Sequence, residues 1–308
     1  MGADLTGTVV VIGHHYPSLL TARTLHEIGF EVAVITPPGG HALADFKELS
    51  SALMATGMRF VATDLQDRGT RTRLIRDELV PASAVLIGLS RPAVVKLGLQ
   101  ARDLHDAGVS GSLMYLHGTE QEEADTCGHD VGYQAMVGVS RLDPASFRIP
   151  WADTLLTASA VSATMTSILK SERGANHVVC EVTGTGALRW ALTFAVQRDQ
   201  NGDVALPPDD PGYGVYSTLD GQVALGMWYD DAAWGRFCHA MGLDELAGLT
   251  GRERNGHRAT VESTLASFTT SRVTAALTAA AVPHARAGDL PTDPNGLPKS
   301  PFVFRTAT

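Results

Sequence analysis

The sequence predicts an α/β protein with a doubly wound parallel sheet, followed by a smaller domain of mixed α and β structure. Three observations support this fold class. β-Branched runs alternate with helical stretches through the first half of the chain, as in βαβ units. An Asp-, Gly- and Pro-rich stretch at 199–212 has the composition of a linker or surface loop. A hairpin pattern and an amphipathic helix follow it.

The first half of the chain contains elements in an order typical of a parallel sheet covered by helices. In chain order we expect strand 8–13, helix 19–29, strand 30–38, strand 58–65, helix 71–80, strand 83–89 and strand 111–118. The turn after the first strand is "GHHYPS", which lacks the second and third glycines of a dinucleotide-binding fingerprint. We therefore favour a plain βαβ unit over a nicotinamide or flavin site.

The second half begins with a long helix of small and apolar residues. This helix starts near Asp153 and ends at Gly174, with basic residues in its last turn. Residues 177–197 predict a buried strand and then another helix. Residues 213–228 predict a β-hairpin with an Asp-Gly pair at its turn, and 231–243 predict an amphipathic helix.

Composition excludes several classes of partner. The formal charge is −9, and no Lys/Arg cluster is dense enough to follow a phosphate backbone, so we expect no nucleic acid partner. The three cysteines lie far apart without metal-ligand spacing, so we expect neither a disulfide framework nor a metal site. The sequence shows neither a signal peptide nor an apolar run long enough to span a membrane. We expect a cytoplasmic protein without a membrane partner.

Two stretches carry acidic and imidazole groups at predicted helix starts. His129 and Asp130 are adjacent in "CGHDVGYQAMVG", and Asp153 follows in "IPWADTLLTAS". Aspartate is a favoured N-cap, and capping alone would explain either aspartate with a stabilisation of ~1 kcal/mol. A lone histidine is likewise more often structural than catalytic. The pattern alone therefore leaves capping and catalysis open.

Four motifs in order resemble the family III CoA-transferases, also called the CaiB/BaiF group, which includes the α-methylacyl-CoA racemases. They are "VLIGLSRPAVVKLGL", "GHDVGYQAMVG", "WADTLLTASAVSATMTSILKSERGANHVVCEV" and "YGVYSTLDGQVALGMWYDDAAWGRFCHAMGL". The resemblance implies a large Rossmann-like domain built from both chain ends, 1–198 and 272–308, a small inserted domain at 199–271, and an interlocked homodimer. It also implies an enzyme that acts on small-molecule acyl-CoA thioesters, with no metal or organic redox cofactor and with coenzyme A only as part of the substrate.

The resemblance also assigns residues. Asp153 matches the aspartate that carries the acyl group and CoA in the transferases and acts as an acid/base in the racemases. His129 matches the histidine of the racemases' "GHD" motif. Arg91 and Tyr133 match positions that line or support the CoA site. Asp130 is expected beside that site, as a cap or as a holder of its neighbour.

The first turn departs from the family pattern. In this chain His14 stands where the family carries an arginine near CoA, and the Gly-Pro that usually follows is missing. Several glycines that often follow the aspartate are also absent after Asp153, where the sequence reads "TLLTAS". Both changes would alter how CoA is held.

Three functions stay open. A racemase or isomerase needs two acid/base groups on opposite sides of one carbon, for which His129 and Asp153 suffice, and helix-start N–H groups could receive the enolate oxygen. A CoA-transferase needs only the Asp153 carboxylate, as a nucleophile that forms an anhydride and then an aspartyl-CoA thioester. A repurposed or inactive member with an altered CoA site is the third. We favour α-proton transfer because the histidine is retained.

Overall fold

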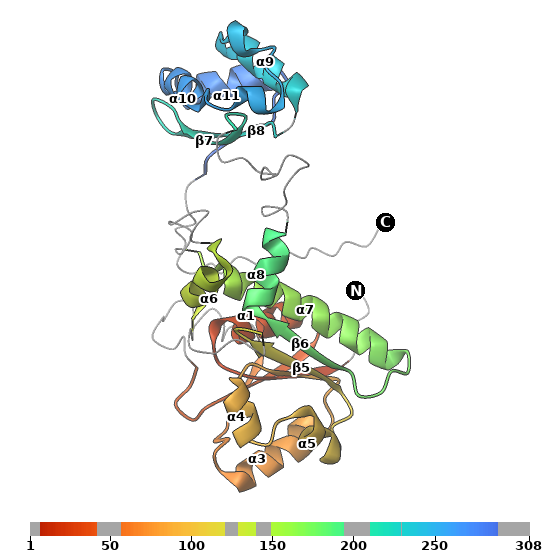
Figure 1. The fold of residues 1–308 in the computed structure, drawn as a ribbon. Helices are drawn as coiled ribbons and strands as arrows, with labels where there is room; N and C mark the ends of the chain where they lie inside the picture. Colours follow the sequence, from red (N-terminus) through yellow and green to blue (C-terminus); the bar gives the residue numbers. More distant parts are fainter. Residues whose placement is uncertain are drawn as a thin grey trace, which may run out of the picture. The chain divides into compact units, whose positions relative to one another are not determined.

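The chain divides after Leu192 into two compact units in the computed structural model. The structure describes residues 7–41, 57–120, 129–139, 149–193, 210–228 and 230–288. Figure 1 shows a parallel sheet with helices in the first unit, and a small sheet with several helices in the second. None of the described helices is long and apolar enough to cross a membrane.

The first unit is built on a six-stranded parallel sheet with the order β3-β2-β1-β4-β5-β6. Its strands are β1 (Thr8–Ile12), β2 (Glu31–Thr36), β3 (Arg59–Ala62), β4 (Ala84–Ile87), β5 (Ser112–His117) and β6 (Val179–Thr183). This is the strand order of a Rossmann-type doubly wound sheet, in which the direction of winding reverses between the first and fourth strands. The predicted fold class is confirmed.

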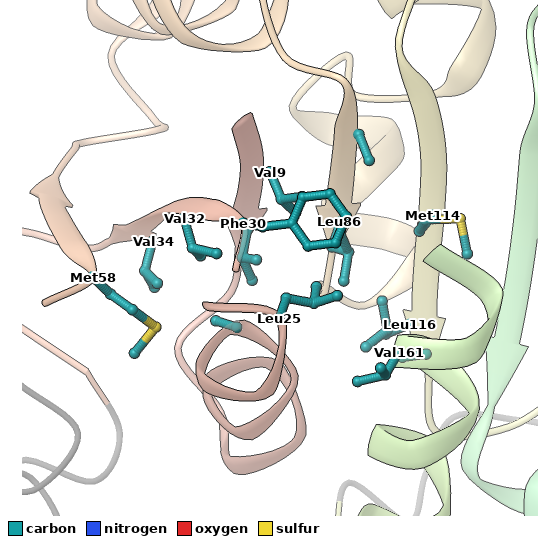
Figure 2. Packing of buried hydrophobic residues seen from close by; sticks show 14 of the residues in the cluster. Val9, Leu25, Phe30, Val32, Val34, Met58, Leu86, Met114, Leu116 and Val161 are labelled. Atoms are coloured by element: carbon teal, nitrogen blue, oxygen red, sulfur yellow. The ribbon is translucent and has the colours of Figure 1, made fainter. Parts of the chain in front are cut away.

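Helices cover both faces of this sheet, and alternate residues of each strand point to opposite helical layers. On one face, Val9 and Val11 pack with the buried sides of α1 (Tyr16–Glu27) and α7 (Trp151–Glu172), the core shown in Figure 2. On the other face, Val10 and Ile12 pack against a second layer. That layer consists of α3 (Arg68–Leu74), the π-helical turn η1 (Ile75–Leu79), α4 (Arg91–Lys96) and α5 (Ala101–Asp106).

Strand β6 differs from its prediction. The run "HVVCEV" predicts a buried strand, but β6 is the outermost strand of the sheet and Val179 is 46% exposed. A β-branched run indicates that a segment forms a strand, but it does not indicate whether the strand lies at the edge or in the middle of the sheet. The predicted helix follows as α8 (Gly184–Leu192), which packs with α6 (Asp130–Val137) and the start of α7 around Tyr133, Ala152 and Leu188.

The second unit pairs a three-stranded antiparallel sheet with helices. The strands β7 (Tyr213–Ser217), β8 (Gln222–Gly226) and β9 (His284–Arg286) lie in the order β7-β8-β9, so the predicted hairpin is present. The helices are α9 (Asp231–Met241), α10 (Arg258–Ala266) and α11 (Thr270–Ala279), with the 3-10 turns η4 (Asp244–Leu246) and η5 (Gly251–Arg254). Trp234 is fully buried in their common core.

The C-terminal boundary of the second unit differs from the predicted one. The prediction assigns residues from 272 onward to the large domain, whereas α11 and β9 belong to the second unit. The physical reason is that Val273, Leu277 and Val282 fill the core that contains Trp234. The part of the prediction that concerns 289–308 lies outside the described residues.

Candidate functional site

The carboxyl edge of the sheet at β1 and β4 is where the fold predicts a ligand. Ligands of doubly wound sheets bind beyond the carboxyl ends of the strands at the point where the strand order reverses. Here β1 leads through Gly13 into His14, His15 and α1, and β4 leads through Gly88 toward Arg91. The candidate residues are therefore assessed by their position relative to this edge.

Asp153 is the third residue of α7, and its carboxylate does not cap the helix. Within the described part of the chain no hydrogen bond to this carboxylate is found, and the side chain is partly buried. Burial, followed by the negative charge of Asp130, raises the pKa of Asp153 to about 6, while His129 acts in the opposite direction. The group can therefore gain and lose a proton close to neutral pH.

Asp130 holds the start of α7 from a neighbouring helix. It is the first residue of α6, and its carboxylate accepts a hydrogen bond from the backbone N–H of Asp153 at 2.9 Å and another from the side chain of Gln134. The Gln134 amide also donates to the carbonyl of Ile149 at 2.9 Å. The capping interpretation is thus correct for Asp130, although the helix that it caps is α7. A direct contact with CoA stays a prediction.

His129 occupies the N-cap position of α6 without using its side chain as a cap. The imidazole is exposed, and it is close enough to Asp153 to lower the pKa of that carboxyl group. The link from Asp130 to the Asp153 N–H joins the two helix starts. Asp130 joins the two helix starts although 23 residues separate it from Asp153, and the charge of His129 acts on the Asp153 carboxyl group.

Tyr133 is buried, and the position of its ring requires a glycine at residue 118. A Cβ atom on Gly118, directly after β5, would overlap the Tyr133 ring, and a Cβ atom on Gly184 would come within 3.7 Å of it. The tyrosine therefore packs over the end of β5 and the start of α8. This position supports α6, and its predicted contact with CoA stays a prediction.

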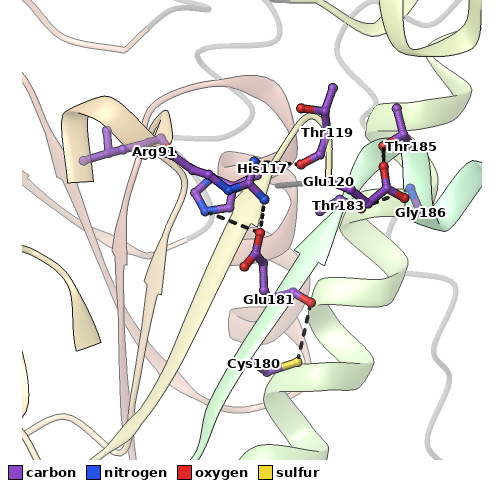
Figure 3. A network of polar contacts seen from close by, with 10 residues as sticks. Arg91, His117, Thr119, Glu120, Cys180, Glu181, Thr183, Thr185 and Gly186 are labelled. Carbon is purple, nitrogen blue, oxygen red and sulfur yellow. Dashed lines mark hydrogen bonds and ion pairs between the residues drawn. The ribbon is translucent and has the colours of Figure 1, made fainter. Parts of the chain in front are cut away.

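Arg91 binds protein groups in this structure. Its guanidinium donates to the carbonyl of Thr119 at 2.8 Å and forms an ion pair with Glu181 of β6, as Figure 3 shows. The ring of His117 lies 4.0 Å from the same Glu181 carboxylate. These contacts tie together the segments after β4 and β5 and the outermost strand. A phosphate of CoA would have to compete with Glu181 for this arginine.

The first turn contributes two residues that sequence reasoning missed, beside the predicted His14. His14 and His15 stack with ring centroids 4.5 Å apart, and the Nδ1 atom of His14 is buried without a hydrogen-bond partner in the described residues. Burial lowers the pKa of both imidazoles, with a further contribution at His15 from His129. Tyr16 interacts with Asp153, which, after burial, raises the pKa of the tyrosine.

A signal for His15 and Tyr16 exists in the sequence. Both follow the glycine that ends the first predicted strand, and residues directly after parallel strands lie at the ligand-binding edge. The missing glycine fingerprint excludes a dinucleotide site but does not remove the turn from that edge. The electrostatic effects of His129 on His15 and of Asp153 on Tyr16 agree with this position.

The comparisons with known proteins agree with this architecture. The sequence profile of CoA-transferase family III matches residues 5–291. A hypothetical protein, Rv3272 from Mycobacterium tuberculosis, has a similar fold with a TM-score of 0.77 at 19% identity over 93% of this chain and 84% of that one. A CAIB/BAIF family protein from Brucella suis has a TM-score of 0.71 at 17% identity over 94% of this chain and 84% of that one. A search of curated proteins found no match.

The chain belongs to CoA-transferase family III, because the family profile spans nearly all of it. The likeness to the two solved structures extends to the fold. Family membership implies an enzyme that acts on an acyl-CoA thioester, and it leaves the reaction to be argued from the site.

Proposed function

We propose that this protein transfers an α-proton of an acyl-CoA thioester, as a racemase or isomerase, with Asp153 and His129 as the acid/base pair. The observation that carries the proposal is the hydrogen bond from the Asp153 N–H to Asp130, the neighbour of His129, which joins the helix starts that bear the two groups. The pKa of the Asp153 carboxyl group is raised to about 6. General acid/base groups work best when their pKa lies near the working pH. Asp153 has no capping contact within the described residues that would explain its position otherwise.

In one turnover of the proposed reaction, one of the two groups removes a proton from the α-carbon and the other supplies a proton to it. The Asp153 carboxylate removes the α-proton on one face, and the His129 imidazolium returns a proton to the carbon on the other. The thioester itself makes the α-C–H bond acidic, so the proposal includes no metal and no redox cofactor, and CoA enters only as part of the substrate. Asp130 holds the helix turn that carries Asp153 through the bond to its N–H.

A CoA-transferase is the second candidate. It is favoured by the same carboxylate: within the described residues no hydrogen bond to the Asp153 carboxylate is found, so its oxygen is free to attack a thioester. The thiolate of CoA would leave as an acyl-aspartyl anhydride forms, and CoA would then displace the acyl group to give an aspartyl thioester. In this mechanism His129 has no required role.

A third candidate is a member whose CoA site has been repurposed. It is favoured by the engagement of Arg91 with Glu181 and by His14 at the position of an expected arginine. Calorimetry with free CoA and acetyl-CoA tests this candidate, because an absence of heat would count against both other functions.

The deciding experiment is solvent exchange. The protein is incubated with a chiral 2-methylacyl-CoA in D2O, and deuterium at the α-carbon is measured by mass spectrometry. We expect exchange in the native protein and its loss in Asp153→Asn and His129→Ala. Asp106→Asn on α5 and His239→Ala on α9 serve as exposed controls that should keep it.

The outcomes separate the candidates. Exchange that survives both site substitutions would remove these residues from the mechanism. No exchange in the native protein, together with an acyl or CoA adduct that hydroxylamine or borohydride traps on Asp153, would favour the transferase.

Assembly remains an expectation from the family resemblance, and location remains one from the sequence. We propose a homodimer in the cytoplasm. Light scattering on the purified protein tests the first, and fractionation of the source cells tests the second.

A further inference from the structure

The first turn of α1 lies against the first turn of α7. The hydroxyl of Thr157 donates to the carbonyl of Asp153 at 2.8 Å and also lies 3.5 Å from the carbonyl of Pro17. Tyr16 directly precedes Pro17 and is the first residue of α1. Tyr16 therefore begins the helix that packs against the start of α7, which carries Asp153.

The helix-start N–H group nearest to Asp153 is already engaged. A developing enolate needs hydrogen-bond donors at its oxygen, and helix N-termini commonly supply them. Here the N–H of Asp153 donates to Asp130, and the N–H of Thr154 donates to the carbonyl of Pro150 at 2.9 Å. The Thr157 hydroxyl likewise points at a carbonyl of its own helix. These three groups therefore already have partners within the protein.

Tyr16 has the properties of such a donor. Its side chain is partly buried, and within the described residues no hydrogen bond to its hydroxyl is found. Burial, followed by the charge of Asp153, raises the pKa of Tyr16, so the phenol stays protonated at neutral pH. A protonated phenol can donate one hydrogen bond.

We propose that Tyr16 is a further catalytic residue, whose phenol O–H donates a hydrogen bond to the thioester carbonyl oxygen while the α-carbon lies between Asp153 and His129. This inference rests on the proposed α-proton transfer. It assigns the stabilisation of the oxygen to a turn in which the chain departs from its family's pattern.

The step balances without an added reactant. The Asp153 carboxylate takes the α-proton, the electron pair of the C–H bond moves into a C=C bond, and the carbonyl π pair moves onto oxygen. The phenol keeps its proton and shares it with that oxygen. When the His129 imidazolium protonates the α-carbon, the electrons return and the carbonyl is restored. Solvent then re-protonates His129 and removes the proton from Asp153.

The test compares Tyr16→Phe with Tyr213→Phe, a substitution at a half-exposed tyrosine of β7 in the second unit. Both proteins are assayed for α-exchange with a 2-methylacyl-CoA and for inhibition by an S-alkyl CoA thioether, which has no carbonyl oxygen. We expect Tyr16→Phe to lower kcat by ~10²–10³-fold, the usual effect of losing one oxyanion donor. KM and thioether inhibition should change by less than about threefold. Tyr213→Phe should match the native protein.

Each outcome bears on the proposal. A kcat loss with unchanged thioether inhibition supports it. A folded Tyr16→Phe protein that exchanges at the native rate overturns it and leaves the proposed function standing. An equal loss of exchange and of thioether inhibition also overturns it, because the phenol would then be holding the site together. No exchange in the native protein overturns the proposed function and this inference with it.

Discussion

The Asp153 carboxyl group stands at the start of α7 with its pKa raised to about 6 from the ordinary 3.8, mainly by burial. A carboxylate at a helix start is usually explained by capping. That explanation belongs to Asp130, which accepts the N–H of Asp153. Asp130 therefore has the structural role at this turn, and the Asp153 carboxylate is available for catalysis.

The pH dependence of catalysis follows from this pKa. If the Asp153 carboxylate is the base, the acid limb of the kcat/KM profile should rise with pH through a midpoint near 6, because this group must be ionised in the free enzyme. The measurement is kcat/KM for α-exchange between about pH 4.5 and 9. Asp130→Asn keeps an acceptor for the Asp153 N–H but removes a charge that raises the pKa, so its midpoint should fall. A native midpoint close to that of a free aspartate would contradict the assignment.

Stability should depend on pH in the opposite sense. The pKa of Asp153 in the folded protein lies above its ordinary value of 3.8. The free energy of unfolding should therefore fall as the pH rises from 3.8 through about 6. We expect Asp153→Asn to gain on the order of 1 kcal/mol at pH 8, after allowance for its partial exposure, and nothing near pH 4. Urea unfolding at both pH values measures this. Asp106→Asn, an exposed control, should show no such difference.

Some site residues could be predicted from sequence and others could not. His129 and Asp153 lie in motifs of fixed order, and Tyr16 follows the glycine that ends the first strand. The pairing of Arg91 with Glu181 joins residues 90 positions apart, on two elements whose adjacency depends on the final sheet order. Short-range patterns carry no information about such a contact.

The junction of α6 with α7 is the element on which the site depends. Asp130 and Gln134 bind the backbone of the α7 start, and Gln134 is completely buried. Gln134 therefore has a structural role that either reaction would use. Positions of this kind are not evidence for one mechanism over the other.

Breaking this junction should affect activity more than stability alone explains. Asp130→Ala removes the acceptor for the Asp153 N–H, and we expect it to cost ~1–2 kcal/mol of folding free energy and to lower α-exchange. Asp67→Ala is the matched control, because Asp67 caps α3 by accepting from Thr70 at 2.6 Å. Thermal unfolding and exchange assays are run on both. Equal exchange in the two proteins would show that the junction does not position Asp153.

The apolar strands could be predicted from the sequence, whereas the shortest helices and the exposure of β6 could not. The strands β1, β2, β4 and β5 are continuous apolar runs, as expected for strands covered on both faces. Helices α4 and α5 have six residues each, which is too short for a 3.6-residue period to be recognised. The exposure of β6 depends on its position in the strand order, which cannot be read from its own residues.

The two units bury their apolar residues in different ways. The first unit buries a sheet between two helical layers, and the second packs one face of a small sheet against helices. The linker composition at 199–212 indicated the division, but the assignment of α11 and β9 required the contacts of Val273 and Leu277. Terminal segments are hard to assign because either core could accept an apolar helix face.

A core substitution should act within its own unit. Trp234 is fully buried, its indole N–H donates to the carbonyl of Leu246 at 2.8 Å, and the guanidinium of Arg254 lies over its ring. Trp234→Ala should cost ~3–5 kcal/mol and raise amide hydrogen exchange within 230–288. Trp190→Ala on α8, at a side chain that is 79% exposed, should change stability by less than about 0.5 kcal/mol. Faster exchange confined to the parallel sheet would contradict this.

The two flanking strands of the described sheet both carry charged side chains in ion pairs. Arg59 on β3 binds both oxygens of Glu78, at 2.9 and 2.6 Å, and Glu181 on β6 binds Arg91. Strands at such flanks offer backbone groups to which a foreign chain can add, and charge discourages that addition. The charge of Glu181 therefore disfavours the addition of another chain to β6, and the same carboxylate forms the ion pair with Arg91. Its replacement by an apolar residue would reduce solubility during expression even where the purified protein still folds.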